Sequence, residues 1–322
     1  MRINFVMSNT VESGIFNAII GYFKKYLPDS DELFVTQYPL EGMDIYHYHR
    51  PNLEKNLLRS SVVTVHHDLE DNDPWFIASN YIERYKEADL VICLNHIQKE
   101  ILQIKYDISN TVVIPHGVNT DLFIPSEKRL SDEKFVIGII SKRYGRRVKG
   151  EAYLHELYKR LDSEKIKFIF VGEDRTIDKN EASAMGFESD VYEYLPYDLF
   201  NDLYYQLNIL LVPSLFEGGP ANIPEALYTK TPVLGRRIAM IRDMIVKGKN
   251  GYYLTGDFNT DAELINDLAS NKNNLYSNLR ESILKYDSKI LNWNNIVDLH
   301  RNSYQKIILN INKDTFVGEE DE

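Results

Sequence analysis

The sequence contains a single cysteine, Cys93, among its 322 residues. An internal disulfide is therefore excluded, and the composition fits a reducing compartment. Cys93 lies in the apolar run DLVICLN, which favours a buried structural residue over a nucleophile. No apolar run approaches the roughly 18 residues of a membrane span, and the start, MRINFVMSN, becomes polar too early for a signal peptide. We therefore expect a cytoplasmic protein.

The sequence has fewer basic than acidic residues, with 37 Lys and Arg against 48 Asp and Glu. The net charge is therefore −11. This balance disfavours broad binding to nucleic acid, which relies on neutralising phosphates.

Several motifs are missing as well. The sequence has no G-x-G-x-x-G after a strand, no G-x-x-x-x-G-K-[S/T] and no G-x-S-x-G, so dehydrogenases, P-loop NTPases and serine hydrolases lose support.

What the chain does have is alternation of short apolar runs with amphipathic stretches, typical of a parallel sheet with helices on both faces. The chain contains two such series and is longer than a domain with a single hydrophobic core usually is. We therefore predict an α/β protein with two doubly wound, Rossmann-like domains. The polar segment PSEKRLSDEK (125–134) marks the boundary. The expected limits are 1–128, 129–294, a final helix at 295–312 and an acidic disordered tail at 313–322. Strands are predicted at 2–8, 32–38, 43–49, 61–67, 89–95, 111–117, 135–141, 167–173, 190–196, 207–214 and 231–237, and helices include 13–26, 74–87, 96–105, 150–162, 198–206, 223–229 and 259–269.

The stretch SLFEGGPANIPEAL (214–227) follows the apolar run LNILLVPS, so it lies where ligands bind in open α/β sheets, beyond the carboxyl end of a strand. Pro224 suits the first turn of a helix, and Asn222 is a plausible cap. Gly218 and Gly219 permit close approach of the backbone to a ligand. The pattern predicts an anion site at a helix N-terminus, beside two carboxylates, Glu217 and Glu225, that could accept hydrogen bonds from sugar hydroxyls. A helix capped by its own glutamate is the structural alternative.

A second strand, FVIGIIS, runs into the basic loop KRYGRRVKG, which holds five cations in eight residues. A solvated basic turn would explain it. However, the loop opens a predicted helix, where the helix dipole disfavours cations. A bound diphosphate would offset that cost.

Four histidines, His47, His49, His66 and His67, end two further predicted strands. They lack the spacing of a zinc site, and we interpret them as hydrogen-bonding groups that face a cleft. Asp71-x-Asp73 could hold a divalent cation on a diphosphate, but the surrounding EDNDP also suggests a turn. We favour the turn and predict no metal.

Together these segments resemble the retaining GT-B glycosyltransferases of the large family four, the glycosyl transferases group 1. SLFEGGPANIPEAL resembles the E-x(7)-E signature of that family. The other matching segments follow the family order over about residues 1–305, and they are DIYHYHRP, VTVHHD, VVIPHGVNTDLFIP, VKG, TPVLGRR and KNGYYL. The early glycine-rich loop departs from the pattern: it is reduced to SNTVESGIF, with Gly14 its only glycine.

The resemblance implies two domains that face a cleft, with the last helix crossing back onto the N-terminal domain. Glu225 would bind the ribose of a nucleotide sugar, and Glu217 would bind hydroxyls of the transferred sugar. Lys149 would bind the diphosphate. Its partner would be Arg143, with Lys142 as the rival and Arg146 and Arg147 less favoured. Either His66 or His67 would reach the sugar, and we place His66 ahead. Backbone of the intervening turn would line the donor site, namely Gly218, Gly219, Pro220, Ala221, Asn222 and Ile223.

The implied reaction is metal-independent transfer, with retention, from a nucleotide sugar, on family frequency a UDP-sugar, to a glycan or lipid-linked glycan. No other cofactor is expected. Alternatives are a GT-B-fold nucleotide-sugar epimerase, a non-catalytic sugar-binding protein and a nucleic-acid glycosyltransferase, which the net charge disfavours. Peripheral contact with the inner face of a membrane is a further hypothesis, from the segment YFKKYL with Tyr22, Phe23, Lys24 and Lys25. An ordinary amphipathic helix is the favoured interpretation of that segment.

Overall fold

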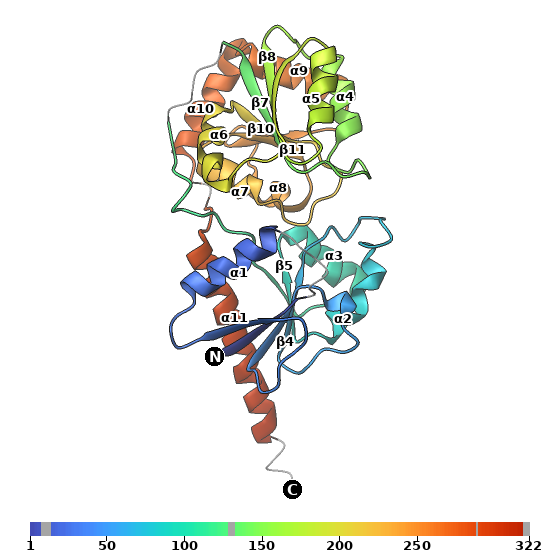
Figure 1. Cartoon of the computed structure of the whole chain (residues 1–322), viewed down its shortest axis with the longest axis vertical. Coiled ribbons are helices and arrows are strands. Elements are labelled where there is room, and N and C mark those ends of the chain that lie inside the picture. The colour runs from blue at the N-terminus through green and yellow to red at the C-terminus, as the bar shows by residue number, and fades with distance from the viewer. Residues whose placement is uncertain (8–13, 128–132, 288, 318–322) are drawn as a thin grey trace. The chain divides into compact units, whose positions relative to one another are not determined.

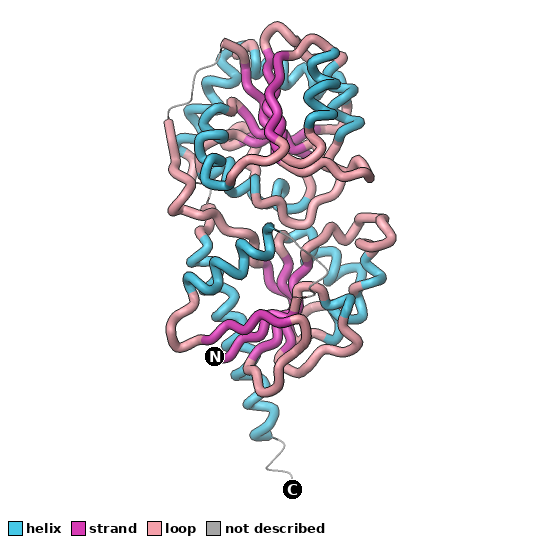
Figure 2. The backbone as a smooth tube through the Cα atoms, viewed as in Figure 1, coloured by secondary structure: helices cyan, strands magenta, loops and turns pink. Residues whose placement is uncertain are grey.

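The computed structural model describes residues 1–7, 14–127, 133–287 and 289–317. The predicted linker, the short glycine-poor loop and the acidic tail therefore fall partly outside the described residues, at 128–132, 8–13 and 318–322. The chain forms two compact units, Met1–Gly117 with Leu291–Glu322, and Val118–Ile290. Each unit holds one six-stranded parallel sheet (Figures 1 and 2). The predicted α/β class with two doubly wound sheets is confirmed.

The unit limits differ from the predicted ones at 128 and 294. Val118 and Phe123 are buried in a core cluster of the second unit, so the chain enters that unit before the polar segment that suggested a boundary. The second unit begins where apolar side chains join its core. The sequence shows more clearly the later change from apolar to polar residues. At the C-terminal end, helix α11 runs over Trp293–Val317, so it extends into the segment predicted as a disordered tail.

The first unit has the strand order β2-β1-β3-β4-β5-β6, with every neighbouring pair parallel. Apolar side chains of α1 and α11 pack together on one face of the sheet, and those of α2 and α3 lie on the other. The final helix thus belongs to the first unit. The bounds are β1 Arg2–Val6, α1 Gly14–Tyr26, β2 Glu32–Thr36, β3 Ile45–Tyr48, β4 Ser61–Val65, α2 Ile82–Glu87, β5 Leu90–Cys93, α3 His96–Tyr106 and β6 Thr111–Val113, with 3-10 turns at Pro51–Leu53 and Ala78–Asn80.

The second unit has the order β12-β11-β10-β7-β8-β9, again all parallel. Counted from β7, this is the 3-2-1-4-5-6 order of dinucleotide-binding sheets. The bounds are β7 Phe135–Ile140, α4 Glu151–Tyr158, β8 Ile166–Val171, α5 Thr176–Ala184, β9 Glu188–Tyr192, α6 Phe200–Gln206, β10 Ile209–Val212, α7 Asn222–Tyr228, β11 Val233–Arg236, α8 Ala239–Met244, β12 Gly251–Leu254, α9 Phe258–Ala269 and α10 Leu275–Lys285, with 3-10 turns at Tyr197–Leu199 and Lys272–Asn274.

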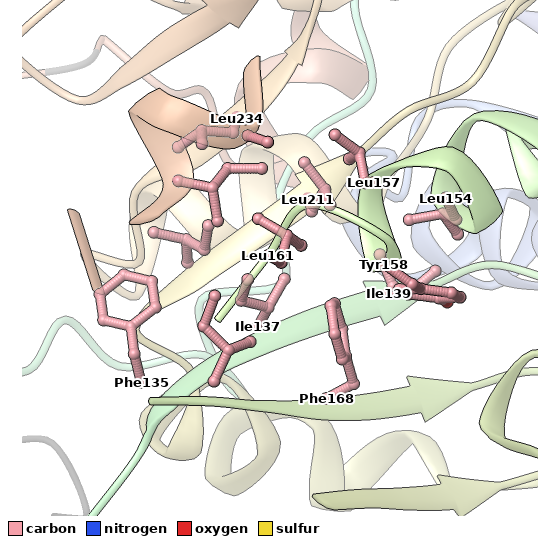
Figure 3. Packing of buried hydrophobic residues seen from close by; sticks show 14 of the residues in the cluster. Phe135, Ile137, Ile139, Leu154, Leu157, Tyr158, Leu161, Phe168, Leu211 and Leu234 are labelled. Atoms are coloured by element: carbon pink, nitrogen blue, oxygen red, sulfur yellow. The ribbon is translucent and has the colours of Figure 1, made fainter. Parts of the chain in front are cut away.

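Alternation along β7 explains why this sheet is covered on both faces. Ile137 and Ile139 share a core cluster with side chains of α4 (Figure 3) and of α5 and α9, whereas Val136 and Ile140 pack with α6, α7 and α8. Every residue of β7 is buried, as expected of an inner parallel strand. Cys93 is likewise fully buried in the first unit, as predicted, and burial raises the pKa of its thiol to about 12.

Candidate functional site

The predicted donor-site segments lie at the point where the strand order of the second unit reverses. β7 pairs with β8 on one side and with β10 on the other, so the loops that follow β7 and β10 leave the sheet side by side. Ligands of open α/β sheets bind at such a position. The basic loop and the glutamate-rich loop, far apart in sequence, are the two loops placed there.

Gly150 joins these two loops by close backbone contact. Its φ is +84°, and a Cβ at this position would lie 2.4 Å from the carbonyl oxygen of Pro213. The Leu215 amide also donates to the Val148 carbonyl, at 2.8 Å. Residue 150 is therefore glycine for two reasons: its backbone is left-handed, and there is no space for a Cβ.

The contact between the loops brings together Lys149 and Glu217. The Lys149 Nζ donates to Glu217 Oε1 at 2.6 Å. Both side chains are mostly shielded, with 15% and 9% of their surface exposed. The ammonium also lies 5.6 Å from the ring centre of Tyr144. The structure therefore supplies a cation and a carboxylate as one unit at the carboxyl end of the sheet.

Asn222 does not cap α7 as predicted. It occupies the first helical position, and no side chain caps the helix. Its Nδ2 instead donates to the Ile140 carbonyl at 2.7 Å, so Asn222 ties α7 to the end of β7. Pro224 does lie in the first turn. The Ile223 amide donates to Pro220 at 3.3 Å, and Pro220 has no N–H, so neither offers a free donor to a ligand. Gly218, Gly219 and Ala221 form the half-buried turn that precedes the helix.

Glu225 is more enclosed than the sequence suggests. Tyr197 donates to one carboxylate oxygen at 2.6 Å, and Tyr204 donates to the other at 2.8 Å. The side chain is nearly buried, and this burial raises the pKa of Glu225 to about 7 against the opposing effect of the two tyrosines. Sequence reasoning missed both tyrosines. The only available signal was that they lie on the segment that precedes β10.

The two candidate diphosphate partners turn away from Lys149 toward acidic residues. Arg143 Nε lies 3.4 Å from Asp178, and Lys142 pairs with exposed Glu173, which raises the lysine pKa. Beneath them, fully buried Arg175 donates to Asp178 and to both oxygens of Ser141. This buried network, absent from the sequence analysis, fixes the first residue after β7. Arg146 and Arg147 are exposed on the same loop.

In the first unit, the four predicted histidines do not share one open surface. His47, His49 and His67 are buried within the first unit, and only His66 is partly exposed. His47 forms 2.7 Å hydrogen bonds with Tyr304 of α11 and Thr64 of β4. Burial holds its pKa well below the usual value and lowers that of His49 to about 3. These strand-end histidines belong largely to the core: α11 covers His47, Phe16 of α1 packs on His49, and Tyr81 packs on His67.

Of the histidine doublet, His66 is the more exposed member. A 3.0 Å hydrogen bond joins His66 Nε2 to His49 Nδ1, and Phe16 packs edge-on against its ring. His67 packs on Tyr81, with ring centres 4.1 Å apart. Arg50, a residue missed by sequence reasoning, lies over the Phe16 ring, and burial lowers its pKa. Its signal was a cation two residues after the strand IYHY.

Asp71 and Asp73 adopt the turn interpretation. Asp71 Oδ1 accepts from the Asp73 amide at 3.0 Å, and Asp73 Oδ1 accepts from the Trp75 amide at 2.9 Å. The predicted helix at 74–87 is accordingly replaced in its first half by turns. Within the described residues, no group of three His, Cys, Asp or Glu side chains is arranged to hold a metal ion.

The aromatic residues of YFKKYL face the protein core. Phe23 is buried, and Tyr22 stacks on Trp293 of α11 at 4.5 Å. Lys24 and Lys25 are the exposed members, so α1 is an ordinary amphipathic helix. Across the described ranges, no helix has both the length and the apolarity needed to span a bilayer.

Comparison with solved structures shows the same fold in several glycosyltransferases. Sucrose-phosphate synthase from Thermosynechococcus elongatus superposes with a TM-score of 0.74 at 14% identity, over 96% of this chain and 99% of that one. HepE from Anabaena, in complex with UDP and glucose, gives 0.73 at 16% identity, over 95% and 100%. A glycosyltransferase from Rickettsia africae gives 0.70 at 15% identity, over 95% and 98%. The fold is therefore GT-B.

Sequence comparison identifies the family directly. No curated protein sequence matches this chain significantly. The model of the family "Glycosyl transferases group 1" matches residues 123–286, which is half of the chain and contains both loops of the donor-site region. The chain belongs to the group 1 glycosyltransferases and is a glycosyltransferase.

Proposed function

We propose that this enzyme transfers a sugar, with retention of anomeric configuration, from a UDP-sugar to a hydroxyl of a glycan acceptor. The observation that carries the proposal is the Lys149–Glu217 pair, at 2.6 Å, where the strand order reverses. Nucleotides bind at this position in open α/β sheets. A cation and a carboxylate held together there match a donor that presents a diphosphate beside sugar hydroxyls.

The chemical difficulty is departure of the sugar from the diphosphate, because negative charge grows on the leaving oxygen. Lys149 supplies a positive charge for that oxygen, and its partner Glu217 fixes the ammonium before the reaction begins. Losing one such preorganised group typically costs on the order of 10²–10³ in rate. Glu217 also accepts hydrogen bonds from hydroxyls of the transferred sugar. These residues provide charge stabilisation without a metal, so we propose a metal-independent reaction.

Glu225 is proposed to bind the ribose. Each of its oxygens accepts one tyrosine hydrogen bond, and a carboxylate oxygen can accept a second. Similar structures support a uridine donor: HepE binds UDP, and also UDP-glucose. Arg143 and Lys142 remain proposals for the diphosphate, but both now require a change of rotamer, since each pairs with an acidic residue.

His66 is the proposed contact to the transferred sugar from the first unit, because it is more exposed than His67 and is oriented by His49. The acceptor is proposed to be a glycan or a lipid-linked glycan of surface polysaccharide or glycoconjugate synthesis. We place the enzyme in the cytoplasm. Contact with the inner face of a membrane would then occur through the acceptor rather than through the aromatic residues of α1.

The testing experiment is calorimetric titration with UDP, GDP and ADP, each with and without EDTA. We expect UDP to bind best and EDTA to have no effect. Lys149→Met and Glu217→Gln should weaken binding of UDP-sugars, while Lys159→Met, an exposed lysine on the same unit, should not. Incubation of the donor alone, followed by NMR, separates hydrolysis from epimerisation, and an epimer would replace the transferase proposal. Nucleotide binding that needs a metal and ignores Lys149 would overturn the site.

A further inference from the structure

The second unit contains a cavity beside the candidate donor site, bordered by Arg143, Gly150 and Leu215. It has a volume of about 550 Å³, within the range of small-ligand pockets. It opens around the first turns of α4 and reaches α5, α9 and the end of β11. Neither Lys149 nor Glu217 lines it. Its polar lining residues are Arg143, Arg147, Glu151, His155, Glu156, Glu181 and Arg236.

Glu151 is the central acidic group of this cavity. Its side chain is 2% exposed, and neither carboxylate oxygen accepts a hydrogen bond. The nearest cation, Arg175, is 4.0 Å away and donates instead to Asp178. A buried carboxylate without a hydrogen-bond donor is unfavourable, because it has lost its water without gaining a replacement. Because a carboxylate is acceptor-only, the missing partner must be a donor such as a hydroxyl.

Two arginines that line the cavity require an anion, whereas Glu151 requires a hydrogen-bond donor. Most lining charges have partners: Arg143 lies near Asp178, Glu156 pairs with the two cations that follow α4, and Glu181 lies 3.9 Å from His155. Arg147 and Arg236 form no ion pair within the described residues, and Arg236 Nε is a buried donor without an acceptor. Guanidinium groups without an acidic partner in a cavity suit a phosphate, because two phosphate oxygens can accept the parallel N–H donors of one planar guanidinium.

The walls are rigid and partly apolar. Tyr153 donates to Asp261 at 2.5 Å, which fixes its ring, and the Arg236 guanidinium lies over that ring at 5.1 Å. Phe258 adds a second aromatic side chain. Arg236 is therefore held over the cavity wall by stacking rather than by an acidic partner, which leaves its donors available.

We propose that this cavity binds a sugar phosphate, with the phosphate at Arg147 and Arg236 and sugar hydroxyls at Glu151. Phosphate alone would place an anion near a buried carboxylate and leave that carboxylate without a donor. A neutral sugar would leave both arginines unpaired. A ligand carrying both groups satisfies all three residues. The cavity adjoins the proposed donor site, because Arg143, Gly150 and Leu215 also line it. The contacts proposed here, Arg147, Arg236 and Glu151, are residues that the proposed donor does not use.

The test is titration of the whole protein, saturated with UDP, with three ligands: glucose 6-phosphate, glucose and inorganic phosphate. We expect glucose 6-phosphate to bind at least about tenfold more tightly than either part. Arg236→Met and Glu151→Gln should each weaken it by about tenfold or more. Arg237→Met is the matched control, since Arg237 is exposed and adjacent in sequence but does not line the cavity. It should leave binding unchanged.

Three results would overturn the proposal: no binding of glucose 6-phosphate at millimolar concentration, equal binding of phosphate alone, or equal loss in Arg237→Met. Arg236→Met carries the test if Glu151→Gln fails to fold, because Arg236 is partly exposed. UDP affinity, measured in the same variants, should not change. If the wild type does not bind UDP, the proposed donor site is wrong. The sugar-phosphate titration is then run without UDP, and its result still tests the cavity on its own.

Discussion

The α-carbon of Gly150 lies so close to the carbonyl of Pro213 that a Cβ would sit 2.4 Å from the oxygen. One residue therefore sets the separation of the β7 and β10 loops. Lys149 immediately precedes this contact, and Glu217 follows it by a few residues. The position of the ion pair depends on a backbone contact rather than on the two charges alone.

Gly150→Ala should destabilise the second unit and weaken UDP binding. The left-handed backbone costs a non-glycine residue about 1–3 kcal/mol, and the overlap with Pro213 adds to it. Gly145→Ala in the same loop is the control, because no atom lies within 4 Å of a Cβ there. It should change stability by less than about 0.5 kcal/mol. Urea unfolding followed by circular dichroism measures both, and equal effects would show that the contact is unimportant.

A double-mutant cycle should reveal coupling between Lys149 and Glu217. Each single change, Lys149→Met or Glu217→Gln, removes the ion pair between these two shielded side chains. The double variant should therefore lose less transfer activity than the sum of the singles, with a coupling of about 0.5–3 kcal/mol. Initial rates of UDP-sugar turnover provide the measurement. Strict additivity would mean that the two residues act independently.

Glu225 should make the second unit less stable as pH rises. Its folded pKa of about 7 lies above the ordinary 4.5, so the folded state binds the proton more tightly. The stabilisation is full below pH 4.5 and is lost between 4.5 and 7, by at most about 3 kcal/mol. Hydrogen exchange of the α7 amides against pH measures it. Glu225→Gln should flatten that profile, and an unchanged slope would assign it to another group.

The first unit should have the opposite pH dependence. His49 has a folded pKa of about 3, lowered by burial and by His300 and Arg50, below the ordinary 6.5. Stability is therefore complete above pH 6.5 and falls with acidification, by about 2 kcal/mol from this group between pH 6.5 and 5. Both tryptophans, Trp75 and Trp293, lie in this unit, so tryptophan fluorescence reports it selectively. His49→Gln should reduce the slope, and identical slopes would contradict the prediction.

Tyr304→Phe should loosen α11. The change removes the hydrogen bond to His47 Nδ1 inside a fully buried contact, and an unsatisfied buried group typically costs about 1–3 kcal/mol. Protection of α11 amides from exchange should fall, while that of α9 should not. Tyr22→Phe, also in the first unit but half-buried, is the control. Comparable losses from both changes would argue against a specific role for Tyr304.

The fold was predictable because its strands are apolar runs of ordinary length. β7 and β10 stand out as FVIGII and ILLV, and their positions in the sheet follow from the regular connections of α/β proteins. β12, GYYL, was not predicted as a strand, because two of its four residues are half-buried tyrosines. The short polar helix α5 was missed for a similar reason: its single buried apolar residue, Ala182, gives little periodicity.

The candidate site was predictable in its loops but not in its pairings. The sequence indicates that Lys149 and Glu217 each follow a strand, and the structure makes these strands neighbours and places the two side chains in contact. It gives no sign that Arg143 turns to Asp178, or that two tyrosines enclose Glu225, because such partners come from elements whose relative rotation depends on core packing. Asn222 shows the same limit: a good capping residue binds the end of β7 instead, because Ile140 offers an acceptor within reach.

The return of α11 to the first unit has a consequence for how the chain folds as it is made. Segment 118–290 holds every strand of its own sheet, so it can complete its core while the chain is still growing. The first sheet emerges earlier, yet Phe5, Phe23 and Ile45 pack against Trp293, Val297 and Tyr304, which emerge last. The part synthesised first is therefore the part finished last, and a chain that ends before Trp293 would leave one apolar face of the earlier sheet covered by α1 alone.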